Sequence, residues 1–216
     1  VLSSHLSMHS KPLNMKHLNL FILTILTVLS TDNIKAKVTD PNIYANEYNK
    51  LVASIGESDK TYDYIMSVYN EYNPVLNSAT SSFFDKQTAA SGLKWIFPYL
   101  MNGAFYYSEH NNAKKALKYA EAYVDTYINP SMKEAGLSVN EYYPVLVYFA
   151  ASNNYNLKNY DKAITYLDAY IKSGDTKNLK DAFNYTAKAY INTKRNKEAK
   201  QVLVSGLSLF PNDLKM

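Results

Sequence analysis

The sequence lacks cysteine and has very little histidine, arginine or glycine. Because none of its 216 residues is cysteine, disulfides, thiolate nucleophiles, thiolate-bound zinc and acylated-cysteine anchors are all excluded. Three of the four histidines lie at or before His17, which leaves His110 in a predicted turn, where we expect a solvated side chain. A two-histidine metal site and a Ser-His-Asp triad are therefore not expected.

The scarcity of arginine and glycine narrows the binding chemistry further. Lysine outnumbers the single arginine, Arg195, by 22 to one. Codon bias in an AT-rich genome would explain this ratio. The alternative explanation is that arginine is nearly absent because the protein needs no bidentate anion clamp. Only six glycines occur, and none forms a phosphate-cradling loop. The formal net charge of +4 falls to +2 without residues 1–36, and no basic stripe is present, so we expect no nucleic-acid partner.

Residues 15–36 are predicted to be a secretory signal peptide. Lys16 and His17 supply a positive start, an apolar run covers residues 18–29, and Ala36 offers a cleavage site, with a cut after Ser30 as the alternative. The run is shorter than the roughly 20 residues that cross a bilayer; an internal apolar helix is the other interpretation. Residues 1–14 are interpreted as an alternative-start or mis-called extension. We expect export to the periplasm or cell envelope of a bacterium, with membrane association only through the leader or a partner.

From residue 42 onward the apolar residues recur at helical spacing, which predicts an all-α protein. A first helix is expected to end at Gly56. A second is capped by Asp59 and stopped by Asn73-Pro74, and a third is capped by Ser81 or Ser82. No alternating strand pattern or hairpin-turn dipeptide is present. Residues 37–97 are thus predicted to form N-terminal helices without a repeat signature.

An internal repeat decides the predicted architecture of residues 98–216. Three pairs of alanines are separated by twelve residues: Ala104 and Ala116, Ala151 and Ala163, and Ala187 and Ala199. A tyrosine stands three residues after the first alanine in the first and third pairs. Small residues let two antiparallel helices cross closely, so the pattern predicts stacked antiparallel helical hairpins, with Pro98 and Pro144 early in their helices. The residues assigned to this packing are Ala104, Tyr107, Ala116, Ala151, Ala163, Ala187, Tyr190, Ala199 and Pro211.

The pattern resembles the tetratricopeptide repeat family over residues 98–211. The closest segment, Tyr185 to Pro211, carries the family's small, aromatic and closing residues at Ala187, Tyr190, Ala199, Gly206 and Pro211. The family repeats every 34 residues, whereas the first alanines here recur after 47 and then 36. We expect the extra residues to form a long loop or an additional turn between Asn129 and Asn140. The resemblance implies a right-handed superhelix.

The resemblance also implies a concave groove lined by the first helix of each hairpin. Taking each first alanine as the origin, groove positions fall three before it, one after it and four after it. They hold Met101, Phe105, Ser108, Tyr148, Ser152, Tyr155, Asn184, Lys188 and Ile191. This mixed stripe is suited to an extended peptide or a partner helix. Alternatively, these residues pack against the N-terminal helices or are simply exposed.

Two further features have a structural and a functional interpretation. Glu121 and Asp125 lie one turn apart on a predicted second helix, where like charges indicate a solvated outward face rather than a glycosidase pair. The 21 tyrosines are expected to pack in the core with their hydroxyls at the surface; stacking on a sugar or an aromatic ligand is the alternative. We expect no catalytic residue, metal or cofactor.

The sequence favours an exported, non-enzymatic interaction module or scaffold that holds a protein partner in its groove. The alternatives are a small-molecule or glycan binding protein, or the repeat fragment of a larger envelope protein; an enzyme is least favoured. Residues 211–216 resemble the start of another helix, so we expect truncation, or a partner that covers the last hairpin.

Overall fold

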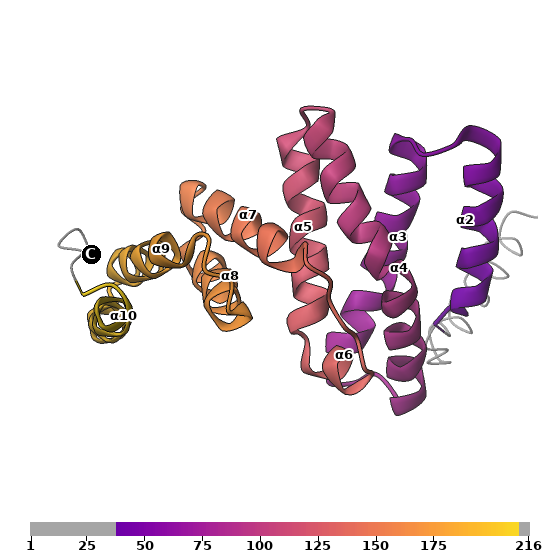
Figure 1. Cartoon of the computed structure of the whole chain (residues 1–216). Helices are drawn as coiled ribbons and strands as arrows, with labels where there is room; N and C mark the ends of the chain where they lie inside the picture. Colours follow the sequence, from indigo (N-terminus) through magenta and orange to yellow (C-terminus); the bar gives the residue numbers. More distant parts are fainter. Residues whose placement is uncertain (1–37, 212–216) are drawn as a thin grey trace, which may run out of the picture. The chain divides into compact units, whose positions relative to one another are not determined.

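The computed structural model describes residues 38–211, and within that range every regular element is an α-helix, which confirms the predicted all-α class (Figure 1). The helices are α2 (Pro41–Ile55), α3 (Asp59–Asn77), α4 (Phe83–Glu109), α5 (Ala113–Ile128), α6 (Pro130–Glu134), α7 (Tyr143–Asn156), α8 (Tyr160–Ser173), α9 (Leu179–Asn192) and α10 (Asn196–Leu209). Helices that follow one another in the sequence pack together, with α4, α7 and α9 each paired with the next long helix. The expected extension at 1–14 and signal peptide at 15–36 lie outside the described residues.

Helix α2 ends as expected, but α3 does not. Gly56, at φ 67°, terminates α2. Helix α3 begins after Ser58, one residue before the expected cap, and continues through Pro74 to Asn77, so the predicted stop at Asn73-Pro74 is wrong. Pro74 lies on the exposed side of the helix, while the residues after it still bury Leu76. Because Asn70 and Pro74 are both exposed, water can hydrogen-bond the Asn70 carbonyl that proline leaves unpaired, and the helix extends to complete its buried stripe.

Helix α4 crosses the boundary that was expected between residues 97 and 98. It begins after Ser82, whose hydroxyl accepts a hydrogen bond from the Asp85 N–H at 3.1 Å. Pro98 lies inside this 27-residue helix, so its predicted place early in a helix is wrong. Pro98 is exposed, whereas Ile96 and Leu100 are fully buried. The N-terminal helices and the first hairpin therefore share one continuous helix.

Two glycines let α4 approach the helices on either side of it. A Cβ on Gly92 would overlap the ring of Tyr72 in α3, and one on Gly103 would overlap the ring of Tyr119 in α5. Both rings are almost fully buried. Since a packed ring cannot move aside cheaply, only glycine fits at these two helical positions.

The three hairpins are closed by the same turn. Seven residues after each first alanine stands a non-glycine residue with positive φ, namely Asn111, Lys158 and Lys194 at 56°, 64° and 61°. The next N–H donates to a carbonyl five residues back, in Asn112 to Tyr107, Asn159 to Asn154 and Arg195 to Tyr190, at 2.8–2.9 Å. This repeated geometry is that of a helix C-terminal cap with a left-handed residue, so the sequence repeat is also a structural repeat.

The extra residues between the first two hairpins form an additional short helix and then a loop, so each of the two expected alternatives is present in part. Asn129 caps the short helix α6 by accepting a hydrogen bond from the Ser131 N–H at 2.9 Å. Residues 135–142 then lead to α7, where Pro144 lies in the first turn as expected. The second and third hairpins are joined only by residues 174–178.

Tyrosine supplies most of the large side chains in the core. The largest fully buried side chains include Tyr62, Tyr72, Tyr107, Tyr119, Tyr123, Tyr166 and Tyr170. Several of their hydroxyls reach acceptors at the edge of the core; Tyr72, for example, donates to the Thr39 carbonyl at 2.7 Å. The hydrogen-bonded hydroxyl offsets its own desolvation while the ring is buried, which confirms the core-packing interpretation for these residues.

Candidate functional site

The predicted groove residues lie on three helices, but they do not form one open surface. Met101 and Phe105 lie on α4, Tyr148, Ser152 and Tyr155 on α7, and Asn184 and Lys188 on α9. All seven are half-buried except Lys188, which is exposed, as are the flanking Ser108 and Ile191.

Residues of the segment 140–142, just before α7, pack on the α4 part of the stripe. The Asn140 amide Nδ2 lies 3.2 Å from the Met101 sulfur, and the Phe105 ring packs edge-on against Tyr142, with centroids 5.5 Å apart. These two predicted groove residues therefore belong to the packing of the insertion rather than to a free groove. The sequence pattern could not locate this contact because the insertion has no counterpart in the other hairpins.

The α7 and α9 part forms a row of tyrosines. The Tyr155 ring centroid lies 4.8 Å from that of Tyr185 on α9 and 5.6 Å from that of Tyr160, and Tyr148 lies 5.2 Å from Tyr170. Tyr185 was not predicted, although it stands beside Asn184 in the same stripe. We call Tyr148, Tyr155 and Tyr185 the tyrosine row; each ring packs on a neighbour with one side and remains partly exposed on the other.

The residues assigned to repeat packing are nearly all buried, unlike those assigned to the groove. All six alanines of the repeat are buried, and so are the aromatic residues of the first and third hairpins, Tyr107 and Tyr190. Pro211 is exposed beyond the end of α10, so it does not join the buried packing. At the tyrosine position of the second hairpin stands Asn154, which is fully buried.

Buried Asn154 belongs to a polar cluster that includes Glu121 and Asp125, the two carboxylates expected on a solvated face. Its amide donates to Glu121 Oε1 at 2.7 Å, and Lys162 lies 2.7 Å from Glu121 Oε2. Asp125 accepts a hydrogen bond from the Tyr166 hydroxyl at 2.8 Å. The expected outward, solvated face is therefore wrong for Glu121 and Asp125: both are half-buried against α7 and α8.

The same contacts recur one hairpin earlier, at the same register. Lys115 precedes the second alanine, as Lys162 does, and its Nζ lies 3.0 Å from Asp63 of α3. Tyr119 follows that alanine by three, as Tyr166 does, and donates to the Tyr62 carbonyl of α3. We call these lysine–tyrosine pairs the inter-repeat ties. Each pair lies on the second helix of a hairpin, α5 or α8, and contacts the helix α3 or α5, which precedes that hairpin in the sequence.

The signal for the ties was present in the sequence as a short repeat. The segments KALKY and KAITY, residues 115–119 and 162–166, share the lysine, alanine and tyrosine. The third hairpin has EAKQV at residues 198–202 instead. It therefore lacks both side chains of the tie.

Burial dominates the electrostatics of the cluster. The pKa of Asp125 is raised above its ordinary value because burial disfavours the charged form, while the Tyr166 hydrogen bond and Lys162 act in the opposite direction. Burial also raises the pKa of Tyr166, reinforced by the nearby Asp125 charge. Asp125 thus holds the contact between α5 and α8 at some electrostatic cost.

The described residues show no arrangement typical of a metal site. Within 38–211 no group of three histidine or acidic side chains is placed to hold an ion. His110 is exposed, as expected; its Nδ1 lies 2.7 Å from the Tyr106 carbonyl, and its ring stacks on Tyr106 at 4.2 Å. No helix in the described range is both long and apolar enough to cross a membrane.

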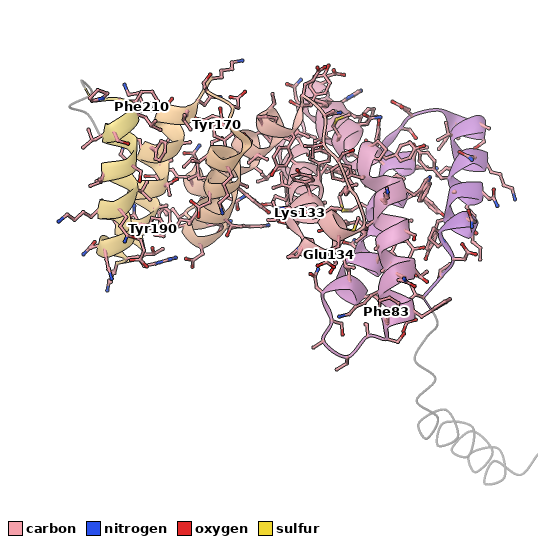
Figure 2. All side chains as sticks on the ribbon, turned by 60° about the horizontal axis from the view of Figure 1, so that its bottom comes forward. Phe83, Lys133, Glu134, Tyr170, Tyr190 and Phe210 are labelled. Atoms are coloured by element: carbon pink, nitrogen blue, oxygen red, sulfur yellow. The ribbon has the colours of Figure 1, made fainter. Side chains whose placement is uncertain are left out.

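The last hairpin presents exposed apolar side chains. Ile191, Val204 and Leu209 are each more than half exposed, and Leu207 is 39% exposed. Figure 2 shows Tyr190 and Phe210 on this hairpin.

No family model, curated protein or solved structure matches the chain.

Proposed function

We propose that this chain is a non-enzymatic interaction module of the tetratricopeptide type, which holds a protein partner against α7 and α9. The observation that carries the proposal is the tyrosine row. Partly exposed aromatic rings on helices held by a repeated turn form a preorganised binding surface, which loses little conformational entropy when a partner docks. The right-handed superhelix and the concave position of this face are part of the proposal.

The side chains around the row indicate what kind of partner would fit. Ser152 and Asn184 offer neutral polar groups, and beyond them stand the exposed Lys188 and Ile191. A partner helix or extended segment would place apolar side chains on the tyrosines and Ile191, and an acidic side chain opposite Lys188. This combination of an aromatic centre and a polar rim is that of protein interfaces.

The test uses exposed residues, because alanine at Tyr148 or Tyr155 would also remove core contacts. The chain would be immobilised and exposed to envelope extract, and bound proteins identified by mass spectrometry. We expect a protein that wild type retains and the Lys188→Glu, Ile191→Asp variant loses. Lys200→Glu, an exposed change on α10, serves as the control and should retain it. Identical retention by all three proteins would contradict the proposed face.

Export is the second part of the proposal, and it rests on the charged start, apolar run and small residue of the segment 15–36. Expression in a bacterium, followed by N-terminal sequencing of the envelope fraction, tests it. A mature N-terminus near residue 31 or 37 supports export, whereas an uncleaved chain in the cytoplasm would contradict it.

A further inference from the structure

The insertion between the first two hairpins builds one wall of a cleft. The cleft has a volume of about 640 Å³, within the range of small-molecule sites. Lys133 of α6 and the segment Val139–Glu141 line it on the inserted side. Thr165, Asp168, Ala169 and Lys172 of α8 also line it. Insertions into a repeat array commonly form its binding face, and this insertion has no equivalent between the second and third hairpins.

Aromatic and apolar side chains give the cleft a firm surface. Tyr127 at the end of α5 packs edge-on against Tyr143 at the start of α7, with ring centroids 4.5 Å apart and planes at 63°. Tyr143 is buried, and Ile128 and Pro144 complete this part of the lining. A planar or ring-shaped ligand could therefore stack on a surface that is already ordered.

Two lysines from different elements supply positive charge to the cleft. Lys133 comes from α6 and Lys172 from α8, and both are exposed. Neither lysine lies within ion-pair distance of a described carboxylate; the charge of Lys172 also acts on the Asp168 carboxyl of α8, which lines the same cleft. The Lys133 Nζ stands 5.7 Å from the centre of the Tyr127 ring, which keeps the charge close to the aromatic surface. Figure 2 marks Lys133 on α6.

The remaining polar side chains are suited to hydroxyl groups. Glu141, Thr165 and Asp168 also line the cleft, and carboxylate and hydroxyl oxygens accept hydrogen bonds from sugar hydroxyls. The lysines would hold an acidic group, because ammonium–anion hydrogen bonds are the stronger kind. Hydroxyl acceptors, cations and an aromatic surface therefore lie together in one cleft.

We propose that the cleft lined by α6 and α8 binds a small polyhydroxylated anion, an acidic sugar or a sugar phosphate, with its acid group held by Lys133 and Lys172. This site is separate from the tyrosine row proposed to bind a protein partner.

Isothermal titration of the full chain would measure binding of glucuronate, glucose 6-phosphate and neutral glucose. We expect one or both anions to bind and glucose to bind at least about tenfold more weakly, since a lost charge-assisted contact of ordinary strength corresponds to that factor. Lys133→Met with Lys172→Met should weaken the anion by a similar factor. Lys114→Met with Lys118→Met, exposed on α5, is the matched control and should bind like wild type.

A further variant tests whether the ligand occupies the cleft, and the two anionic probes distinguish a carboxylate ligand from a phosphate ligand. Ala169→Trp fills the cleft without changing charge and should abolish binding, provided that its circular dichroism remains that of wild type. Glucuronate binding identifies a carboxylate ligand, and glucose 6-phosphate binding a phosphate ligand; either supports the proposal. Binding of no probe, equal binding of glucose, or full anion affinity in the double lysine variant would overturn it.

Discussion

Single residues in this protein are constrained most tightly where a helix touches an aromatic ring. Gly103→Ala should lower the free energy of unfolding by about 1–3 kcal/mol, because the added methyl group would overlap the buried ring of Tyr119. Denaturant unfolding measures the change. Ser91→Ala, on the exposed side of the same helix, should change stability by less than about 0.5 kcal/mol. If Gly103→Ala stabilised the protein, as glycine-to-alanine changes in open helices do, the close approach would be refuted.

The hairpin turns hold lysine where glycine would be less strained. Lys158 and Lys194 have positive φ, which costs an L-residue roughly 1–2 kcal/mol. Replacement by glycine should raise stability by about 0.5–1 kcal/mol, after subtracting glycine's greater loss of chain entropy. Asn111→Gly should gain less, because asparagine tolerates this conformation better than lysine. Thermal unfolding of the three variants would show the order, and a loss of stability in Lys158→Gly would contradict it.

Asp125 makes folding stability depend on pH. Because its pKa is raised in the folded protein, the folded state keeps the proton to higher pH than the unfolded chain does. This carboxyl's contribution to stability therefore falls as pH rises from the ordinary aspartate value through the raised one, and is constant above it. Asp125→Asn should flatten that part of the curve and leave the protein at least as stable at pH 7, since the new amide oxygen can still accept from Tyr166.

Urea unfolding between pH 4 and pH 7 measures this effect. Glu134→Gln, an exposed change on α6, should leave the slope unaltered. A slope in Asp125→Asn that equals that of wild type would assign the pH dependence to other groups.

At the scale of elements, the inter-repeat ties decide how successive hairpins are joined. Tyr166→Phe should cost about 1–3 kcal/mol, because it leaves the half-buried Asp125 without its hydroxyl donor. Tyr123→Phe is the control: its ring is equally buried, but its hydroxyl makes no hydrogen bond to a described residue. Equal effects of the two changes on the free energy of unfolding would show that the tie does not stabilise the contact between α5 and α8.

Prolines and caps show how element boundaries depend on packing. The stop at Gly56 and the cap at Ser82 follow local chemistry, so they could be predicted from the sequence. The passage of α3 through Pro74 and of α4 through Pro98 could not. Both prolines lie on exposed faces, and the buried residues beyond them, Leu76 and Leu100, compensate for the lost backbone hydrogen bond.

At the scale of the whole molecule, stability should be unequal along the described chain. Helix α10 buries only Ala199 and Gly206, and the third hairpin has neither residue of the tie. In a repeat array, where each unit is stabilised mainly by its neighbours, this hairpin should open first. We expect amide hydrogen exchange in α9 and α10 to be at least about tenfold faster than in α4 and α5, corresponding to a gap of at least 1.4 kcal/mol in opening free energy. Equal protection would contradict this gradient.

Local sequence patterns are enough to predict the helical class, the alanine contacts and the hairpin turns. These features depend on residues within about a dozen positions of each other, such as Ala151 and Ala163, so a local pattern is enough to specify them. The groove stripe was only partly predictable, since the insertion that engages Met101 and Phe105 occurs once and follows no period.

Which faces of the helices are covered depends instead on how the helices pack against one another. Glu121 and Asp125 look like a solvated pair in the sequence, and they are half-buried because α7 and α8 lie against them. The hydrogen bond from Tyr166 to Asp125 spans 41 residues, and the cleft beside Lys133 and Lys172 joins elements at a similar separation in the sequence. Contacts at that separation depend on how whole helices pack, and no spacing within a single helix specifies that.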